Sequence, residues 1–217
     1  MNTKQYNVVS LADRVFDRLE RDIISGIYQK GEVLTELRLV EELGVSRTPI
    51  REALRRLAQE RLIQETPKGS IVLGITRRDL EDILMMRVRV EGLVAYYAAQ
   101  NRTQEQLDEM LHTVELQEYY VSKRDTAHVV EMDTRFHDMI FTMANHPMLT
   151  DALKPMLRKI MKFRRESMDI LSRAERSVKE HRALYETIAA GERDRAESLM
   201  THHVDNARQS ILDACRE

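Results

Sequence analysis

The sequence predicts a mainly α protein in two parts: an N-terminal winged helix-turn-helix (three helices plus a small β-wing) followed by an all-α antiparallel helical bundle. Three observations support this prediction. Among 217 residues there are only 7 Gly and 4 Pro, so few breakers interrupt long runs of helix formers. Apolar residues recur at helical spacing through most of the chain. In residues 62–73, by contrast, two short apolar runs flank a turn.

The composition is that of a chain able to bury a sizeable core. Hydrophobic residues make up 42% and charged residues 32%, and the net charge of −2 argues against a general binder of polyanions. Cys215 is the single cysteine, which excludes an intrachain disulfide and fits a reducing cytosol. No apolar run approaches the roughly 20 residues of a membrane span, and no signal peptide core is present. We therefore expect a cytoplasmic protein with no membrane partner.

The N-terminal helices are predicted from their capping residues. Residues 1–9 are expected to form a loose arm. Ser10 then begins a helix, with Asp13 as its capping-box partner, and Gly26 can end it in left-handed geometry. Thr35 can cap a second, shorter helix. An apolar stripe at four-residue spacing gives the first helix one inward face: Leu11, Val15, Leu19 and Ile23.

A third helix is predicted to start near Ser46–Pro49, because proline is tolerated in a first turn. Its inward face carries apolar residues at positions i, i+3, i+4 and i+7: Ile50, Ala53, Leu54 and Leu57. From Arg47 to Arg61 the chain has five Arg against two Glu, a local charge of 5 − 2 = +3. A compact basic patch on a nearly neutral chain suits docking into a DNA groove.

The first turn of this helix carries side chains suited to reading DNA. Arg can read guanine through two hydrogen bonds, and Ser or Thr can bond a base or a phosphate. The residues so placed are Ser46, Arg47, Thr48 and Arg51. Strands at about 62–65 and 70–73 then form the wing, and Lys68 and Gly69 at its tip suit a phosphate or minor-groove contact. An Arg-rich helix face alone is often only solvated; the complete order of helices and wing favours DNA binding.

Everything after Thr76 is predicted to be helical. The expected helices, separated by short breaks, cover residues 77–100, 103–123, 126–144, 148–171, 174–190 and 193–214. Six helices with short connections predict an antiparallel bundle.

One acidic residue and three histidines of this bundle are predicted to face inward together. Asp133 and His137 are four residues apart and so share a helix face. His181 lies ten residues before the Gly191 turn and His203 twelve after it, so an antiparallel hairpin brings both to nearly the same level. Such a set suits a divalent transition metal ion such as Zn²⁺, Ni²⁺ or Mn²⁺. A single histidine at an apolar border is more often a satisfied core residue, so the residues alone leave both roles open.

The stretch GVSRTPIREALRRLAQERLI resembles the winged helix-turn-helix of GntR-family transcription regulators, over about residues 10–75. The resemblance implies DNA contacts at five positions: Ser46, Arg47, Thr48, Arg51 and Gly69. Many members carry Arg followed by Glu inside the second helix, where this chain has Leu37-Arg38. Leu37 cannot supply that contact. Either Arg38 replaces it from a neighbouring face, or one contact is missing.

The second part resembles the metal-containing FCD-type bundle of the FadR subfamily. The matching stretches are RVRVEGLVAYYAA, the Asp133–His137 helix ending in NHP, and EHRALYETIAAGERDRAESLMTHHV. The resemblance implies a metal ion held by four residues: Asp133, His137, His181 and His203. It also implies a small organic acid as effector. Arg87 matches an arginine that often lines the effector pocket, although an ion pair with Glu91 at i+4 explains it equally well.

Together these patterns predict a ligand-responsive DNA-binding transcription regulator, more commonly a repressor in this family, and not an enzyme. Residues 1–76 are expected to bind DNA, and residues 77–217 to bind ligand and dimerise. A homodimer would match a palindromic operator. Two alternatives remain from the sequence. One is a metalloenzyme that uses the Asp and three His; the other is a constitutive DNA-binding protein whose bundle only dimerises.

Overall fold

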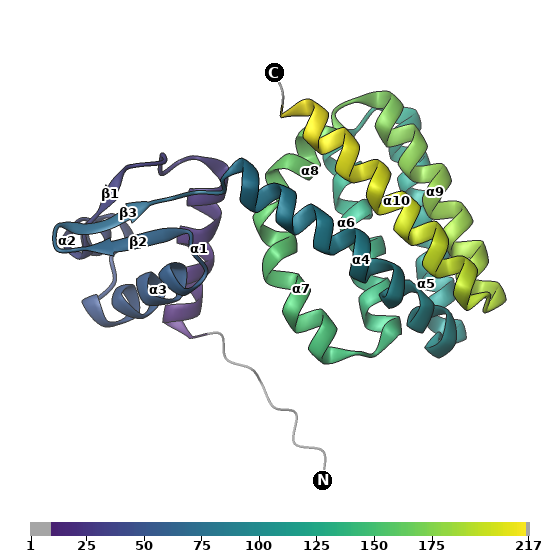
Figure 1. Cartoon of the computed structure of the whole chain (residues 1–217), viewed down its shortest axis with the longest axis horizontal. Helices are drawn as coiled ribbons and strands as arrows, with labels where there is room; N and C mark the ends of the chain where they lie inside the picture. The colour runs from purple at the N-terminus through teal and green to yellow at the C-terminus, as the bar shows by residue number, and fades with distance from the viewer. Residues whose placement is uncertain (1–9, 216–217) are drawn as a thin grey trace, which may run out of the picture. The chain divides into compact units, whose positions relative to one another are not determined.

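The computed structural model describes residues 10–215, and the predicted arm of residues 1–9 lies outside them. The chain forms two compact units, the first ending at Arg77 and the second beginning at Arg78 (Figure 1). The mainly α fold class predicted from the sequence is confirmed. Within the described residues, no helix is long and apolar enough to cross a membrane.

The first unit combines three helices with a three-stranded sheet. In chain order its elements are α1 (Leu11–Ser25), β1 (Val33–Leu34), α2 (Glu36–Leu43), α3 (Arg47–Gln59), β2 (Ile63–Thr66) and β3 (Gly69–Val72). Ser10 and Asp13 form the predicted capping box of α1, and Gly26 ends that helix with a φ of 84°. Thr35 caps α2 through the backbone N–H of Arg38. The capping residues thus set the helix boundaries, as the sequence predicted.

The sheet has the strand order β1-β3-β2, and both pairings are antiparallel. The wing hairpin is present, with each predicted strand displaced by about one residue. Strand β1 carries no sequence signal, because two residues are too few to show an alternating pattern. One apolar core joins the helices to this sheet, centred on fully buried side chains: Leu19, Leu34, Leu39, Ile50, Leu57 and Leu62.

The second unit is an all-α bundle. Its helices are α4 (Arg77–Asn101), α5 (Gln104–Lys123), α6 (Thr126–Ala144), α7 (Pro147–Lys159), α8 (Met161–Met168), α9 (Leu171–Ala190) and α10 (Arg193–Ala214). Helix α5 packs against α6 and α9, and α10 packs against α8 and α9. Figure 1 shows α9 and α10 running side by side on either side of the turn at Gly191.

One helix prediction was wrong. The segment 148–171, predicted as a single helix, forms the two helices α7 and α8. Ile160 leaves helical geometry, with φ −98° and ψ 3°, and its side chain is fully buried. Burial of this side chain accompanies the break, and no Gly or Pro stands at that position to signal it. The break matters because α8 carries Arg164 into the centre of the bundle.

Helix α4 lies against α10 at Gly92. A Cβ at this position would overlap the Thr201 hydroxyl and lie 3.1 Å from the backbone oxygen of Glu197. Glycine therefore allows the two helices to approach closely. The contact lies one residue from Glu91 on α4 and two residues before His203 on α10, so it helps to fix the spacing of the site described next.

Candidate metal centre and DNA-binding face

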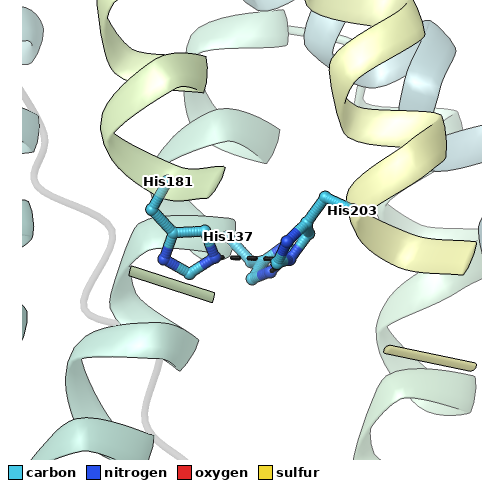
Figure 2. Close-up of side chains that lie close together, drawn as sticks. All are labelled: His137, His181 and His203. Atoms are coloured by element: carbon cyan, nitrogen blue, oxygen red, sulfur yellow. Dashed lines mark hydrogen bonds between the residues drawn. The ribbon is translucent and has the colours of Figure 1, made fainter. Parts of the chain in front are cut away.

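Three histidines converge at the centre of the bundle. His137 on α6, His181 on α9 and His203 on α10 are all buried, with 4%, 0% and 1% of their surface exposed. The Nε2 atom of His203 lies 3.2 Å from Nε2 of His137 and 3.3 Å from Nε2 of His181 (Figure 2). The prediction that His181 and His203 lie at the same level of the α9–α10 hairpin agrees with this geometry.

The outer nitrogen of each ring has a hydrogen-bond acceptor. Nδ1 of His203 lies 2.7 Å from Glu180, and Nδ1 of His137 lies 3.2 Å from Glu91. Nδ1 of His181 lies 2.7 Å from Oε1 of Gln117. Because each Nδ1–H donates outward, a neutral ring presents a bare lone pair at Nε2.

This donor set fits a divalent metal ion. Three lone pairs that point at one another have no hydrogen to share, so they repel unless a cation lies between them. At a metal–nitrogen distance of about 2.0–2.1 Å, two tetrahedral ligands lie about 3.3 Å apart. The observed nitrogen–nitrogen distances of 3.2 and 3.3 Å match this spacing. The outward hydrogen bonds are the partners that metal-binding histidines ordinarily have.

Asp133, the fourth predicted ligand, lies beside this cluster. Its Oδ1 is buried, has no hydrogen-bond partner, and is 3.7 Å from Nε2 of His181. Its Oδ2 accepts a 2.5 Å hydrogen bond from Arg164 on α8. One carboxylate oxygen is therefore held by Arg164, and the other lies near the imidazole of His181 without a hydrogen bond. Its role as a ligand stays a prediction.

The protonation states of the cluster favour cation binding. Burial alone would raise the pKa of Asp133, but the neighbouring charged and polar groups, Arg164 foremost, together outweigh it, and the pKa lies below its ordinary value. The pKa of Glu91 is also lowered, because Arg87 and the hydrogen bond with His137 together outweigh its burial. Burial lowers the pKa of His181 well below 6.5 and that of His203 to about 4. These carboxylates are charged and these two imidazoles are neutral at pH 7, as metal ligation requires.

A cavity adjoins the cluster and is rich in arginine. Its volume is about 10 Å³, close to what one water molecule needs. Arg87, Arg164 and Arg173 all line it, together with His137 and His203. Three guanidinium groups against one carboxylate, that of Asp133, give the cavity a positive lining, which suits an anion.

The sequence left two roles open for Arg87, an ion pair with Glu91 and a place in the effector pocket, and the structure shows the first. Its Nε donates a 2.5 Å hydrogen bond to Glu91, so the i+4 ion pair is present. Its Nη1 is nevertheless buried without a hydrogen-bond partner, and the side chain lines the cavity. Arg87 is thus held by Glu91 while one N–H group has no acceptor, and its part in effector binding stays a prediction.

A larger groove of about 680 Å³ lies elsewhere on the second unit, lined by residues of α5, α6 and α8. Its charged lining has three carboxylates and two guanidiniums, and the pair Arg135–Glu109 is largely exposed. This groove is neither buried nor positive, so the smaller cavity suits an anion better than the groove does.

Several residues of the centre escaped the sequence analysis: Glu91 as a histidine partner, Gln117, Arg173 and Glu180. Gln117 is fully buried, and its amide nitrogen lies 3.5 Å from the backbone oxygen of Val129. For Glu180 a sequence signal was available, because it immediately precedes the predicted ligand His181.

The predicted DNA-reading residues lie together on the surface of the first unit. Ser46 is the N-cap residue of α3 but makes no capping hydrogen bond through its side chain. Arg47, Thr48 and Arg51 in the first turns are exposed. The opposite face of α3 is buried in the core, so these side chains point away from it. Their DNA contacts stay a prediction.

Two of the predicted arginines are engaged by carboxylates. Arg51 donates a 2.7 Å hydrogen bond to Glu36 at the start of α2, and its side chain is 63% exposed. Arg38 is bonded to Glu42 at 2.6 Å and to Glu32 at 2.7 Å. Arg38 would have to leave both carboxylates to bind DNA in place of Leu37. Arg51 has only one partner to release.

The wing tip shows a structural use for Gly69 beside the predicted DNA contact. Gly69 has a φ of 131°, and a Cβ there would lie 2.8 Å from the backbone oxygen of Leu34. The glycine therefore allows β1 to pair with β3. Lys68 is exposed at the turn, where the Thr66 hydroxyl accepts from its backbone N–H.

Comparisons with known proteins agree with this architecture. The model described as "Bacterial regulatory proteins, gntR family" matches residues 11–73, and the FCD domain matches residues 82–206. The gluconate operon transcriptional repressor of Bacillus licheniformis is 27% identical over 205 residues, covering 92% of this chain and 84% of that protein. The HTH-type transcriptional repressor RspR of Escherichia coli K12 is 26% identical, covering 94% and 90%.

Among solved structures, E. coli McbR/YncC is similar in fold, with a TM-score of 0.75 and 21% identity over 96% of this chain and 98% of that one. The winged fold and the matched families define a DNA-binding transcription regulator rather than an enzyme. The chain belongs to the gntR family of bacterial regulatory proteins and carries an FCD domain. The metalloenzyme alternative is therefore set aside.

Proposed function

We propose that this protein is a repressor whose operator affinity is controlled by a small organic acid, bound at a divalent metal site in the C-terminal bundle. The observation that carries the proposal is the convergence of three bare Nε2 atoms, from His137, His181 and His203, beside a cavity lined by arginines. The metal ion, Zn²⁺, Ni²⁺ or Mn²⁺, would supply positive charge and open coordination positions for a carboxylate.

The chain's own residues then have separate roles. Asp133 and the three histidines would hold the ion, and Glu91, Gln117 and Glu180 would orient the imidazoles through Nδ1. Arg87 and Arg173 would bind the acid, because each has a buried N–H group with no hydrogen-bond partner. The first unit, residues 1–76, would read a palindromic operator as part of a homodimer through residues 77–217. Two relatives are named as transcriptional repressors, which supports repression rather than activation.

The small size of the cavity means that binding an organic acid would change the conformation of the bundle. In this conformation about 10 Å³ is too little for an organic acid. Binding must therefore displace a lining element. Helix α8 contributes Arg164, Ser167 and Met168 to the lining and is only 8 residues long, so it is the element that would move. An acid that binds only the opened arrangement shifts the population toward it, and operator affinity follows if the two arrangements bind DNA unequally.

The test begins with selection of operator fragments from random duplex DNA by the full chain. Affinity for the selected site is then measured by fluorescence anisotropy at fixed salt, with metal alone and with metal plus a panel of organic acids. We expect one or more acids to weaken binding by about 5–150-fold. His181→Ala should remove this response while leaving operator affinity intact. An acid response that survives in the metal-free variant would contradict control by the metal site.

A further inference from the structure

The core of the second unit holds an equal number of positive and negative side chains around the three histidines. The six groups, all buried except the partly exposed Glu180, are Arg87, Glu91, Asp133, Arg164, Arg173 and Glu180. Burying one such charge without compensation is costly, so the balance among them determines what else the site can take.

The six groups form three pairs, each made of one carboxylate and one guanidinium. Glu91 pairs with Arg87 at 2.5 Å, and Asp133 with Arg164 at 2.5 Å. Glu180 accepts from Arg173 at 3.2 Å. Asn206 donates to the other oxygen of Glu180 at 2.7 Å.

Two of these carboxylates also hold an imidazole by its outer nitrogen. Glu91 lies 3.2 Å from Nδ1 of His137, and Glu180 lies 2.7 Å from Nδ1 of His203. The third ring, His181, has the neutral amide of Gln117 as its Nδ1 partner. With the rings in the neutral form that ligation requires, the centre carries no net charge before a metal ion binds.

A divalent ion then leaves an uncompensated charge of +2 in the interior. The remaining capacity to bind an anion is already present. Nη1 of Arg87 and Nη2 of Arg173 are buried without hydrogen-bond partners, and both side chains line the cavity. Two guanidinium N–H groups on different helices, α4 and α9, can each engage a separate carboxylate.

We propose that the site binds a divalent metal ion and a doubly negative carboxylic acid as a pair, each strengthening the other. The inference rests on the proposed metal site and narrows the effector class from organic acids in general to dianions. A monocarboxylate leaves one buried positive charge uncompensated, and a neutral compound leaves two. Binding of the acid and of the ion must strengthen each other by the same factor, because linkage is reciprocal.

The experiment uses the full chain, Co²⁺ as the metal and three probes of nearly equal size: succinate, its monoamide succinamate, and succinamide. The Co²⁺ dissociation constant is measured by visible absorption at each probe concentration, using free-ion concentrations because dicarboxylates also bind Co²⁺ in solution. We expect succinate to tighten Co²⁺ binding about tenfold or more, succinamate clearly less, and succinamide not at all.

A charge variant provides the second arm. Glu180→Gln keeps an acceptor for His203 but raises the net charge of the centre by one. Without a probe, this variant should bind Co²⁺ more weakly than the unmodified chain. Succinate should then raise its Co²⁺ affinity by a larger factor. Glu118→Gln is the matched control, because Glu118 forms a partly exposed pair with Arg182 away from the centre. It should leave both quantities unchanged.

The outcomes separate this inference from the proposed function. Equal effects of succinate and succinamate on Co²⁺ affinity, or no effect of either, overturn the charge pairing while the metal site stands. The charge pairing is likewise overturned if Glu180→Gln behaves like Glu118→Gln. Absence of Co²⁺ binding to the unmodified chain overturns both the proposed metal control and the pairing.

Discussion

The two units place their charges in opposite ways. In the first unit the apolar core contains the inward faces of α1 and α3, and ion pairs such as Arg51–Glu36 and Arg38–Glu42 lie at the surface. In the second unit three ion pairs and three histidines occupy the middle of the bundle. Both units are built mainly of helices that bury apolar side chains, so helical packing alone does not require this difference.

The difference fits the partner proposed for each unit, DNA for the first and a small ligand for the second. Exposed pairs are worth little, so Arg51 can exchange Glu36 for a DNA phosphate or base at small cost. Buried pairs are costly to assemble and more costly to break, and they stabilise a fold less than an apolar core would. Their presence in the second unit therefore points to a bound ligand. Removing single charges or the metal ion from each unit tests this contrast.

Arg164→Met should have the largest effect on stability. It leaves the Asp133 carboxylate buried without its cation, which costs about 3–5 kcal/mol. The measurement is urea unfolding of metal-free protein, followed by far-UV circular dichroism. Arg182→Met, which breaks the partly exposed pair with Glu118, is the control and should cost less than about 1 kcal/mol. Equal losses in the two variants would mean that burial does not distinguish these pairs.

Removal of the metal ion should have the second-largest effect on stability. At a free metal concentration of 100 times the dissociation constant, a chelator should lower the free energy of unfolding of the second unit by about 2.7 kcal/mol. Thermal unfolding with and without EDTA measures this change. The His203→Ala variant should show no dependence on the chelator. If it responds as the unmodified chain does, the ion binds elsewhere.

Arg51→Ala should weaken specific operator binding by about 1–3 kcal/mol if Arg51 reads a base. Fluorescence anisotropy at fixed salt gives the affinity, because phosphate contacts alone also depend on salt. Arg208→Ala, which removes a partly exposed charge from α10 in the second unit, should not change it. An unchanged affinity for Arg51→Ala would remove this residue from the reading face.

Arg38→Met should have the smallest effect on folding. Its two partners, Glu32 and Glu42, are partly exposed, so the loss in free energy of unfolding should stay below about 1 kcal/mol. Chemical denaturation of the full chain measures it. Operator affinity of the same variant decides whether Arg38 acts in place of Leu37: weaker binding shows that Arg38 leaves its carboxylates for DNA.

The sequence was sufficient wherever a pattern is local. The Ser10–Asp13 capping box, the Gly26 helix end and the wing turn depend on neighbours in the chain, and each was predicted. Helical spacing also placed His181 and His203 on facing sides of one hairpin. These predictions need only the period of the helix and the direction of the turn.

The remainder of the centre depends on contacts between distant segments. Gln117 lies 64 residues from His181, and Arg164 lies 31 residues from Asp133. No local rule selects these partners, because each sits on a helix whose rotation is set by the whole bundle. The break at Ile160 is also without a local signal, because no Gly or Pro stands there and its side chain is buried in the bundle.

The close approach of α4 and α10 at Gly92 also affects which size of metal ion the proposed histidine site would prefer. The carbonyl of Glu197 and the Thr201 side chain lie against this glycine, and His203 follows on the same helix. A methyl group at position 92 would require the Thr201 side chain to turn away and the backbone at Glu197 to shift slightly, which would change the spacing of α4 and α10. Gly92→Ala should therefore change the relative affinities for Zn²⁺ and Mn²⁺, because His203 lies on the same helix two residues beyond Thr201. The preference for one ion over another would then reside in helix spacing, outside the ligand set.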